Sequence, residues 1–433
     1  MSEPAASDAV LASELTSLIS ELYPICRSIT GDGLRETLRI LRRVVPLEIV
    51  EVPSGTPVLD WVVPREWNIR DAWIKDPSGN KVVDFRASNL HVVSYSTPVS
   101  GRFPLAELRP HLHSLPGQPD AIPYRTSYYE EAWGFCLTQR QLDALADGEY
   151  EVCIDSTLAP GSLSYGELLI PGHTAEEILI SAHACHPSLC DDNLSGVVVA
   201  LLLARELSNR PRGRCGVRFL FAPGTIGAIT WLARNQASAS RIAHGLTLTC
   251  LGDGHPFTFK RSFSGEADID RAARQVLKDS GLAHQLIDFF PYGYDERQYN
   301  SPGFRLPVGS LMRGRHGQFP EYHTSLDDPS FVSEAQLLES YRVLKGIVDC
   351  LQRNRRYKNL QPYAEPQLGK RGLYRAIGGT GLPGLQFAML WVLNMSDSEH
   401  SLLAIAERSG LPFEQIHAAA RLLLSRELLA EVD

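Results

Sequence analysis

The sequence predicts an α/β fold, with a mostly parallel sheet that carries helices on both faces. Three observations predict this fold and the two further domains that accompany it. Strand-like apolar runs alternate with helix-like segments over residues 166–352, which is typical of open sheets whose helices connect parallel strands. Residues 49–165 are rich in Pro and Gly and carry only short β-type runs, which indicate an inserted β-rich domain. Residues 366–433 contain three helical stretches, which indicate a separate C-terminal unit.

Residues 1–48 are expected to supply the first two helices of the α/β domain. Apolar side chains recur at helical spacing between residues 11 and 22, as on the buried face of an amphipathic helix. A polar loop over residues 27–33 then precedes a second helix over residues 34–44. The next apolar run, residues 47–52, predicts the first short strand of the inserted domain.

The α/β block contains strand-like runs that are each followed by a helical segment. The expected strands are 178–182, 217–222 and 246–251, and the expected helices are 194–207, 226–235, 269–280 and 334–352. Open sheets of this kind bind their ligands at the carboxyl ends of the strands. The residues that directly follow each strand are therefore the first candidates for a functional site.

Composition narrows the class of protein. The formal net charge is −8, which argues against nucleic acid as the main partner. The longest apolar runs fall far short of the roughly 20 residues that cross a bilayer, and the N-terminus lacks the features of a signal peptide. We therefore expect a cytoplasmic protein without a membrane partner. The eight cysteines include no Cys-x-x-Cys pair, so free thiols are expected rather than a disulfide framework.

The C-terminal unit combines a helix-turn-helix pattern with a charge that does not suit DNA. The turn Ser409–Pro412 joins the last two of three expected helices, 385–394, 399–408 and 413–426. From Leu385 to Asp433 three arginines stand against seven acidic residues, a net charge of −4. Affinity for DNA comes largely from neutralising phosphates. We therefore expect the unit to serve packing or subunit contacts in a homo-oligomer rather than to bind DNA.

The strongest chemical signal follows the first strand of the α/β block. His183 and His186 stand where this strand ends, and Asp192 opens the helix that follows. Imidazole and carboxylate are ligands that zinc accepts, and a catalytic zinc site needs three of them plus an open position. His323, in a loop before the last helix of the block, is the candidate ligand from elsewhere in the chain. The acidic pair 327–328 is expected to orient its ring.

These motifs resemble the co-catalytic zinc aminopeptidase family. Residues 166–350 share with it a strand that ends in His, the run DDNLSG before an apolar helix, and a late His-Thr before an Asp. The chain also carries RSITGDG, HACHP, DERQYNSPG and PEYHTS. With these it resembles, over nearly its whole length, bacterial aminopeptidase-like proteins that have an inserted domain and a C-terminal winged helix. The resemblance implies zinc bound by His183 or His186, by Asp192 and by His323.

The chain departs from this family at positions that matter for the chemistry. The dizinc enzymes place two adjacent glutamates where this chain has Gly224 and Thr225, and another aspartate where it has Thr249. One of those glutamates is a metal ligand and the other is the general base, so two of the family's five ligands are absent and the expected cofactor is one zinc ion per chain. The general base is missing as well. Glu321, two residues before His323, is the expected substitute, ahead of Asp253, Asp295 and Glu296.

The loop 292–299 is expected to line the substrate pocket, because a loop at this place does so in the related enzymes. Asp295 is a candidate to hold a substrate amine, Arg297 to hold a carboxylate, and Arg125 of the inserted domain to cover the pocket. The predicted activity is zinc-dependent hydrolysis of an amide bond in a small peptide or an aminoacyl or N-acyl conjugate. The alternatives are a metal-binding pseudoenzyme or assembly protein, favoured by Gly224 and Thr225, and a transcription factor that senses a ligand.

Overall fold

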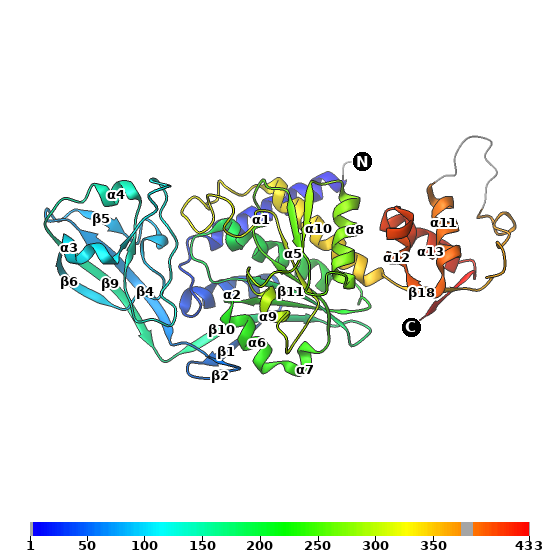
Figure 1. Cartoon of the computed structure of the whole chain (residues 1–433), viewed down its shortest axis with the longest axis horizontal. Helices are drawn as coiled ribbons and strands as arrows, with labels where there is room; N and C mark the ends of the chain where they lie inside the picture. Colours follow the sequence, from blue (N-terminus) through cyan, green and yellow to red (C-terminus); the bar gives the residue numbers. More distant parts are fainter. Residues whose placement is uncertain (1–2, 374–383, 433) are drawn as a thin grey trace. The chain divides into compact units, whose positions relative to one another are not determined.

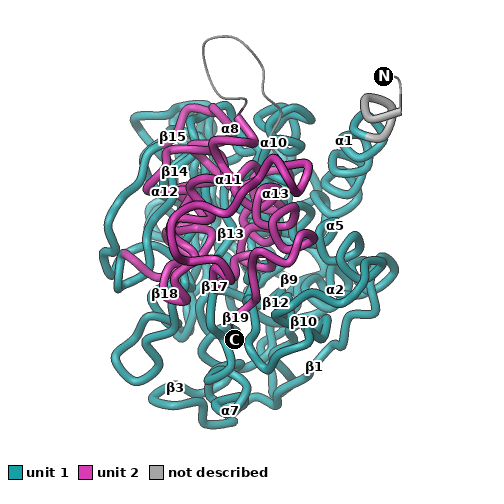
Figure 2. The backbone as a smooth tube through the Cα atoms, turned by 90° about the vertical axis from the view of Figure 1, so that its right-hand side faces the viewer, with its two compact units in different colours: residues 1–265, 285–341 teal, residues 266–284, 342–433 magenta. Residues whose placement is uncertain are grey.

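The computed structural model describes residues 3–373 and 384–432, with side chains from residue 8 onward. The chain forms two compact units, residues 1–265 with 285–341 and residues 266–284 with 342–433 (Figure 2). Residues 1–2 of the predicted N-terminal segment, and residues 374–383 and 433 of the predicted C-terminal unit, lie outside the described residues.

An eight-stranded mixed sheet forms the centre of the first unit (Figure 1). Its strands lie in the order β1 (Glu48–Pro53), β10 (Ser162–Ile170), β12 (Gly216–Ala222), β11 (Glu177–His183), β13 (Ile242–Leu248), β16 (Val308–Met312), β14 (Phe257–Lys260) and β15 (His284–Ile287). The four middle strands β12, β11, β13 and β16 pair in parallel. The pairs that β10 makes with β1 and β12, and that β14 makes with β16, are antiparallel.

The predicted α/β fold is confirmed, with the correction that the sheet is mixed rather than mostly parallel. Parallel neighbours need a crossover connection, usually a helix, and the alternating sequence pattern covers only strands of this kind. The run 47–52, expected in the inserted domain, is instead part of β1, which pairs with β10 so that Glu48 lies opposite Glu167. The sequence of a short strand does not show which distant strand it pairs with, so the pairing of β1 with β10 could not be predicted.

Helices cover the two faces of this sheet, as predicted. α1 (Glu3–Leu22) and α2 (Asp32–Val44) both contact α5 (Gly196–Ser208). α6 (Ile226–Arg234) contacts the short α9 (Glu296–Tyr299) on the other face (Figure 1). Every residue of β11 and β12 is buried, as expected of strands covered on both faces. The remaining helices of the block are α7 (Gln236–Ala239) and α10 (Glu334–Arg353).

The inserted β-rich domain lies in the chain between β1 and β10. Its antiparallel sheet has the order β5 (Lys81–Asp84), β4 (Glu66–Lys75), β9 (Glu149–Ala159) and β6 (Val99–Pro104). Phe135 and other buried apolar residues give it a core of its own. Its shorter elements are β2 (Pro57–Val58), β3 (Trp61–Val62), α3 (Leu105–Leu108), β7 (Leu112–His113), β8 (Phe135–Cys136) and α4 (Gln139–Asp143).

The second unit contains a three-stranded sheet and a helix-turn-helix. The strands lie in the order β18 (Asp397–Ser401), β17 (Arg356–Asn359) and β19 (Leu429–Val432), and the helices are α11 (Gly384–Met395), α12 (Leu402–Ser409) and α13 (Phe413–Leu424). Because β17 belongs to this sheet, the unit begins before the predicted residue 366. α8 (Asp268–Ser280) packs against α12, where Arg271 and Arg274 donate to the carboxylate of Glu407.

We expect the full chain not to bind duplex DNA through this second unit. α13, the second helix of the pair, carries one arginine, Arg421, and the opposing charge of Glu414. Non-specific DNA binding rests on several phosphate contacts and reaches a Kd of about 10⁻⁴–10⁻⁶ M. An anisotropy titration with random duplex at ~50 mM salt checks this expectation. Micromolar or tighter binding that weakens steeply with salt would contradict it.

The sequence predicts free thiols and no membrane-spanning segment. All eight cysteines are free in the structure. Within residues 3–373 and 384–432 no helix is long and apolar enough to cross a membrane.

Candidate metal centre

Parallel strands of the large sheet end at one edge, and the residues at their ends define the candidate site. β11 ends at His183, β12 is followed by Gly224, β13 is followed by Thr249, and β16 is followed by residues 313–316. This edge is where open α/β sheets bind their ligands. The site therefore lies where the rule of strand ends predicts it.

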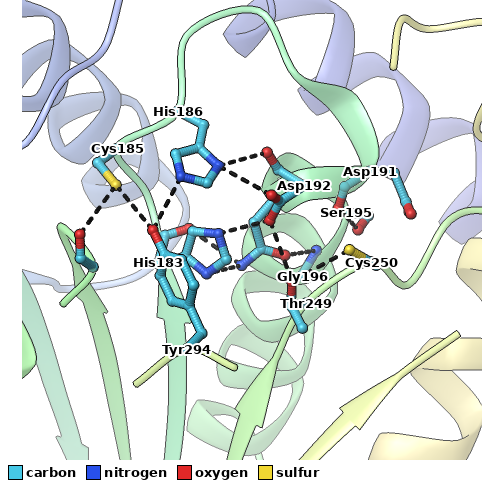
Figure 3. Close-up of polar contacts among 12 residues, drawn as sticks. His183, Cys185, His186, Asp191, Asp192, Ser195, Gly196, Thr249, Cys250 and Tyr294 are labelled. Carbon is cyan, nitrogen blue, oxygen red and sulfur yellow. Dashed lines mark hydrogen bonds and ion pairs between the residues drawn. The ribbon is translucent and has the colours of Figure 1, made fainter. Parts of the chain in front are cut away.

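Three imidazoles face the carboxylate of Asp192 at this edge. His183 Nε2 lies 2.8 Å from Asp192 Oδ1, and His186 Nδ1 lies 3.3 Å from Oδ2 (Figure 3). His323 Nε2 lies 3.0 Å from the same Oδ2. Asp192, His183 and His186 are buried, whereas 33% of the His323 side chain is exposed. The structure thus brings all four predicted ligands together, and both histidines of the 183–186 segment face Asp192.

Asp327 fixes the loop that presents Asp192. Its carboxylate accepts the backbone N–H groups of Cys190, Asp191 and Asp192 at 3.1, 2.6 and 2.9 Å. Asp327 therefore orients this loop rather than the ring of His323, which was its expected role. The conformation of this loop is therefore fixed by hydrogen bonds from its backbone N–H groups to a carboxylate that is distant in the sequence.

Burial and mutual charge set the protonation of these groups. Burial lowers the pKa of His183 to about 4, against the attraction of Asp192. Burial also opposes protonation of His186, but the charges of Asp192 and Cys185 outweigh it and raise the pKa of His186 well above its ordinary value. Burial would raise the pKa of Asp192, yet His186 and His183 hold it well below its usual range. An ionised Asp192 and a neutral His183 are the forms that bind metals.

Tyr294 fills the space beside Gly224, where the family resemblance places a glutamate. A Cβ atom on Gly224 would lie 1.9 Å from a ring carbon of Tyr294. The ring lies against that of His183, tilted by 31° with 3.7 Å between centroids, and the hydroxyl lies 3.0 Å from His186 Nε2 (Figure 3). Thr249 stands where the family resemblance places an aspartate, and its Oγ1 donates to Asp192 Oδ1 at 3.3 Å. Both positions thus face the site without supplying a carboxylate.

The inserted domain reaches the site through Tyr124. Its backbone N–H donates to the carbonyl of His323 at 2.8 Å, and its ring centroid lies 5.1 Å from that of His186. Arg125, predicted to cover the pocket, is exposed, and its Nη1 lies 3.0 Å from Nδ1 of His113 in the same domain. The structure therefore places Tyr124, rather than Arg125, against the site.

The remaining predicted residues differ in how enclosed they are. Asp295 is buried, and its Oδ1 has no hydrogen-bond partner among the described residues. Burial, with the charges of Cys185 and Glu296, raises the pKa of Asp295 well above its usual range. Arg297 also has a buried Nε without a partner in the described chain. Glu321 is half-buried, and no hydrogen bond or ion pair joins its carboxylate to the described ligands.

The donor set fits a zinc ion. One nitrogen each of His183 and His186 and one oxygen of Asp192 lie within 4.8 Å of one another. Two imidazoles with one carboxylate are a ligand set of catalytic zinc sites, and they leave a tetrahedral position open. A ligating imidazole commonly bonds an outer partner through its second nitrogen. His186 has this arrangement, since Nδ1 faces Asp192 and Nε2 faces the hydroxyl of Tyr294.

The fold is similar to that of zinc aminopeptidases. BSAP, a zinc aminopeptidase from Bacillus subtilis, matches with a TM-score of 0.57 and 12% identity over 78% of this chain and 94% of that chain. A peptidase from Shewanella amazonensis matches with a TM-score of 0.52 and 13% identity over 79% and 95% of the two chains. At this identity the likeness shows the fold alone.

The chain belongs to the family described as "Domain of unknown function (DUF4910)", which matches residues 16–354, and a winged helix-turn-helix family matches residues 355–431. A Clostridium acetobutylicum protein named "Putative polysaccharide biosynthesis protein with aminopeptidase-like domain" is 52% identical over 417 residues, 96% of each chain. The crystal structure named as a "putative peptidase" from the same species matches with a TM-score of 0.94 and 49% identity over 99% of each chain. The predicted resemblance and the winged helix are thereby confirmed.

Proposed function

We propose that the chain is a zinc-dependent hydrolase of an amide bond in a small peptide or an aminoacyl or N-acyl conjugate, with one zinc ion per chain. The observation that carries this proposal is the convergence of three imidazoles on Asp192 at the strand-end edge. The aminopeptidase-like fold supports a peptidase-type hydrolase. Residues 224–225 and Thr249 support a single ion, because none of them supplies the carboxylate that a second ion needs.

The residues of the site have separate tasks in such a reaction. Asp192, His183 and His186 would hold the ion, and zinc bound there supplies polarisation of a carbonyl oxygen and acidification of water. Tyr294 orients His186 through its hydroxyl and covers His183 with its ring. The ring centroid of Tyr124 lies 5.1 Å from that of His186, which is buried. These contacts favour a site that is organised before substrate binds.

A carboxylate must still carry a proton to the leaving amine, and we propose Asp295 for this task ahead of the expected Glu321. Asp295 is buried, its Oδ1 has no partner among the described residues, and it directly follows Tyr294, whose ring lies against His183. Asp295→Asn should lower kcat by about 10²–10⁴-fold while zinc stays bound. Steady-state kinetics with parallel zinc analysis measures both. Glu321→Gln is the matched comparison, and a loss of this size there but not in Asp295→Asn would reverse the assignment.

Substrate hydrolysis is the test of the proposed function. The zinc-loaded full chain is incubated with a panel of small peptides, aminoacyl conjugates and N-acyl conjugates, and amine release is followed. We expect turnover that a chelator abolishes and added zinc restores. The name of the 52% identical relative refers to polysaccharide biosynthesis. Amides on amino sugars therefore belong in the panel as a carbohydrate form of the N-acyl class.

A metal-binding protein without turnover is the second candidate. The observation that favours it is the ring of Tyr294 beside Gly224, which occupies the place of the family's general base. This candidate predicts bound zinc and no hydrolysis across the whole panel. Turnover of any one conjugate in the presence of zinc, lost in Asp192→Asn, excludes it.

A further inference from the structure

A cavity of about 110 Å³ lies near the ligand cluster. Cationic, amide and aromatic side chains line it, among them Lys260, Phe290, Tyr292, Arg315, His316 and Gln318. Arg315 and His316 directly follow β16, so they stand at the same edge of the sheet as His183. The cavity is several times larger than the roughly 30 Å³ that one water occupies, so it admits a group of several non-hydrogen atoms.

His316 links this cavity to the proposed metal ligands. Its ring centroid lies 6.2 Å from that of Tyr294, whose ring lies against His183. It also lies 6.0 Å from the ring centroid of Tyr322, which stacks on His323. One ring, Tyr294 or Tyr322, therefore lies between His316 and each of His183 and His323. The cavity is in this sense a neighbour of the candidate metal centre.

One cation of the cavity, Arg315, has no acidic partner among the described residues. Arg315 makes no hydrogen bond or ion pair through its side chain with any residue that the structure describes. His316 Nε2 is shut off from solvent and also lacks a partner in the described chain. Lys260, by contrast, donates to Glu296 Oε1 at 2.7 Å and to the carbonyl of Tyr292 at 2.6 Å. A guanidinium and an imidazole nitrogen without a described partner, both lining one cavity, are groups that bind an oxyanion.

The loop that forms one wall of the cavity is held rigidly. Lys260 and Glu296 form an ion pair that is fully buried on both sides, and the backbone N–H of Tyr294 donates to Glu296 Oε2 at 3.0 Å. A Cβ atom on Gly293 would lie 2.1 Å from Glu296 Oε1, so only glycine lets the loop approach this pair. A wall fixed in this way reduces the ordering cost of binding a ligand.

We propose that this cavity binds an anionic group of the substrate, a carboxylate or a phosphate, next to the amide bond that the metal centre cleaves. The inference rests on the proposed function, because it names which conjugates the site accepts. Arg315 is the specificity-determining residue, and His316 supplies a second polar contact. Conjugates with a negative charge beside the amide are then the preferred class of substrate.

Direct anion binding tests the proposal without any need for turnover. The zinc-loaded full chain is titrated by calorimetry with inorganic phosphate and, separately, with succinate. We expect saturable binding of one of them, and the tighter one identifies the group as phosphate or carboxylate. Arg315→Gln should weaken it by about 10–100-fold, the loss of one hydrogen bond between charged groups. Absence of binding by the wild type, or equal binding by Arg315→Gln, overturns the proposal.

Two further variants keep the test sharp. Arg102→Gln removes an arginine of the inserted domain that is 70% exposed, and it should bind the anion as the wild type does. Arg315→Lys keeps the charge without the planar fork, and its affinity should lie between those of wild type and Arg315→Gln. A loss of binding in Arg102→Gln equal to that in Arg315→Gln would show a general surface effect and overturn the assignment to the cavity.

Matched substrates separate this proposal from the proposed function. Among conjugates that are hydrolysed, a glutamate-containing member should exceed its glutamine counterpart in kcat/KM by about tenfold or more, and Arg315→Gln should remove the difference. Equal rates for both members overturn the cavity proposal and leave hydrolysis standing. Anion binding through Arg315 without hydrolysis of any conjugate supports the cavity and sinks the proposed function alone.

Discussion

Replacing Asp192 by asparagine should remove the metal from the protein and abolish hydrolysis. Three imidazoles converge on this carboxylate, and its two oxygens lie 2.8 Å from His183 and 3.0 Å from His323. An amide has no charge with which to balance the ion. The loss of zinc affinity should therefore exceed the roughly 10–100-fold effect of changing an outer partner. Chelator competition measures the affinity, and elemental analysis after dialysis measures the zinc content.

Asp191→Asn is the matched control for this variant. Asp191 is the neighbouring carboxylate and equally buried, but it accepts the backbone N–H of Gly252 at 2.7 Å and points away from the imidazoles (Figure 3). It should keep its zinc when circular dichroism shows that both variants are folded. A full equivalent of zinc in folded Asp192→Asn would refute the ligand assignment.

Gly224→Glu should destabilise the protein instead of restoring a general base. The space that the new side chain needs is filled by the ring of Tyr294, 1.9 Å from the position of a Cβ atom. Overpacking of a close-packed interior costs about 1–3 kcal/mol and at times more. The urea midpoint should fall accordingly, and zinc binding should weaken because the ring that leaves its place also orients His186.

Two variants isolate the cause of this loss. Gly254 has no atom within 4 Å of an added Cβ, so Gly254→Glu should leave the unfolding free energy nearly unchanged. Tyr294→Ala in the Gly224→Glu background removes the ring and should recover part of the stability. A single Gly224→Glu variant that is as stable as the wild type would show that Tyr294 does not occupy this space.

The ligand cluster could be predicted because its signal is local. A buried apolar strand that ends in His183 and a helix that opens after Asp192 identify a strand end, and strand ends of parallel sheets meet at one edge. His323 was a candidate from its place in a loop before the last helix of the block, and the family resemblance implied the same residue. The structure brings these residues together as the sequence analysis expected. The resemblance also identified Gly224 and Thr249, because the sequence shows directly that neither position holds a carboxylate.

Other parts of the site could not be predicted, because they depend on contacts between distant segments. β16 went unrecognised because it is a run of five residues just after Pro307, and with it the strand-end residues Arg315 and His316 were missed. Asp327 acts by accepting hydrogen bonds from backbone N–H groups. Almost every residue has such a group, so the sequence does not show which ones Asp327 binds. Tyr124 and Tyr294 stand in aromatic loops that the sequence marked, but only the fold shows which ring faces the ligands.

Zinc stoichiometry tests the central claim most directly. The full chain, purified without added metal, is dialysed against zinc and then against metal-free buffer, and its zinc content is determined by elemental analysis. A single centre on Asp192, with Gly224 and Thr249 in place of further carboxylates, predicts one equivalent per chain that is absent from Asp192→Asn. Two equivalents, or none after zinc supplementation, would contradict it.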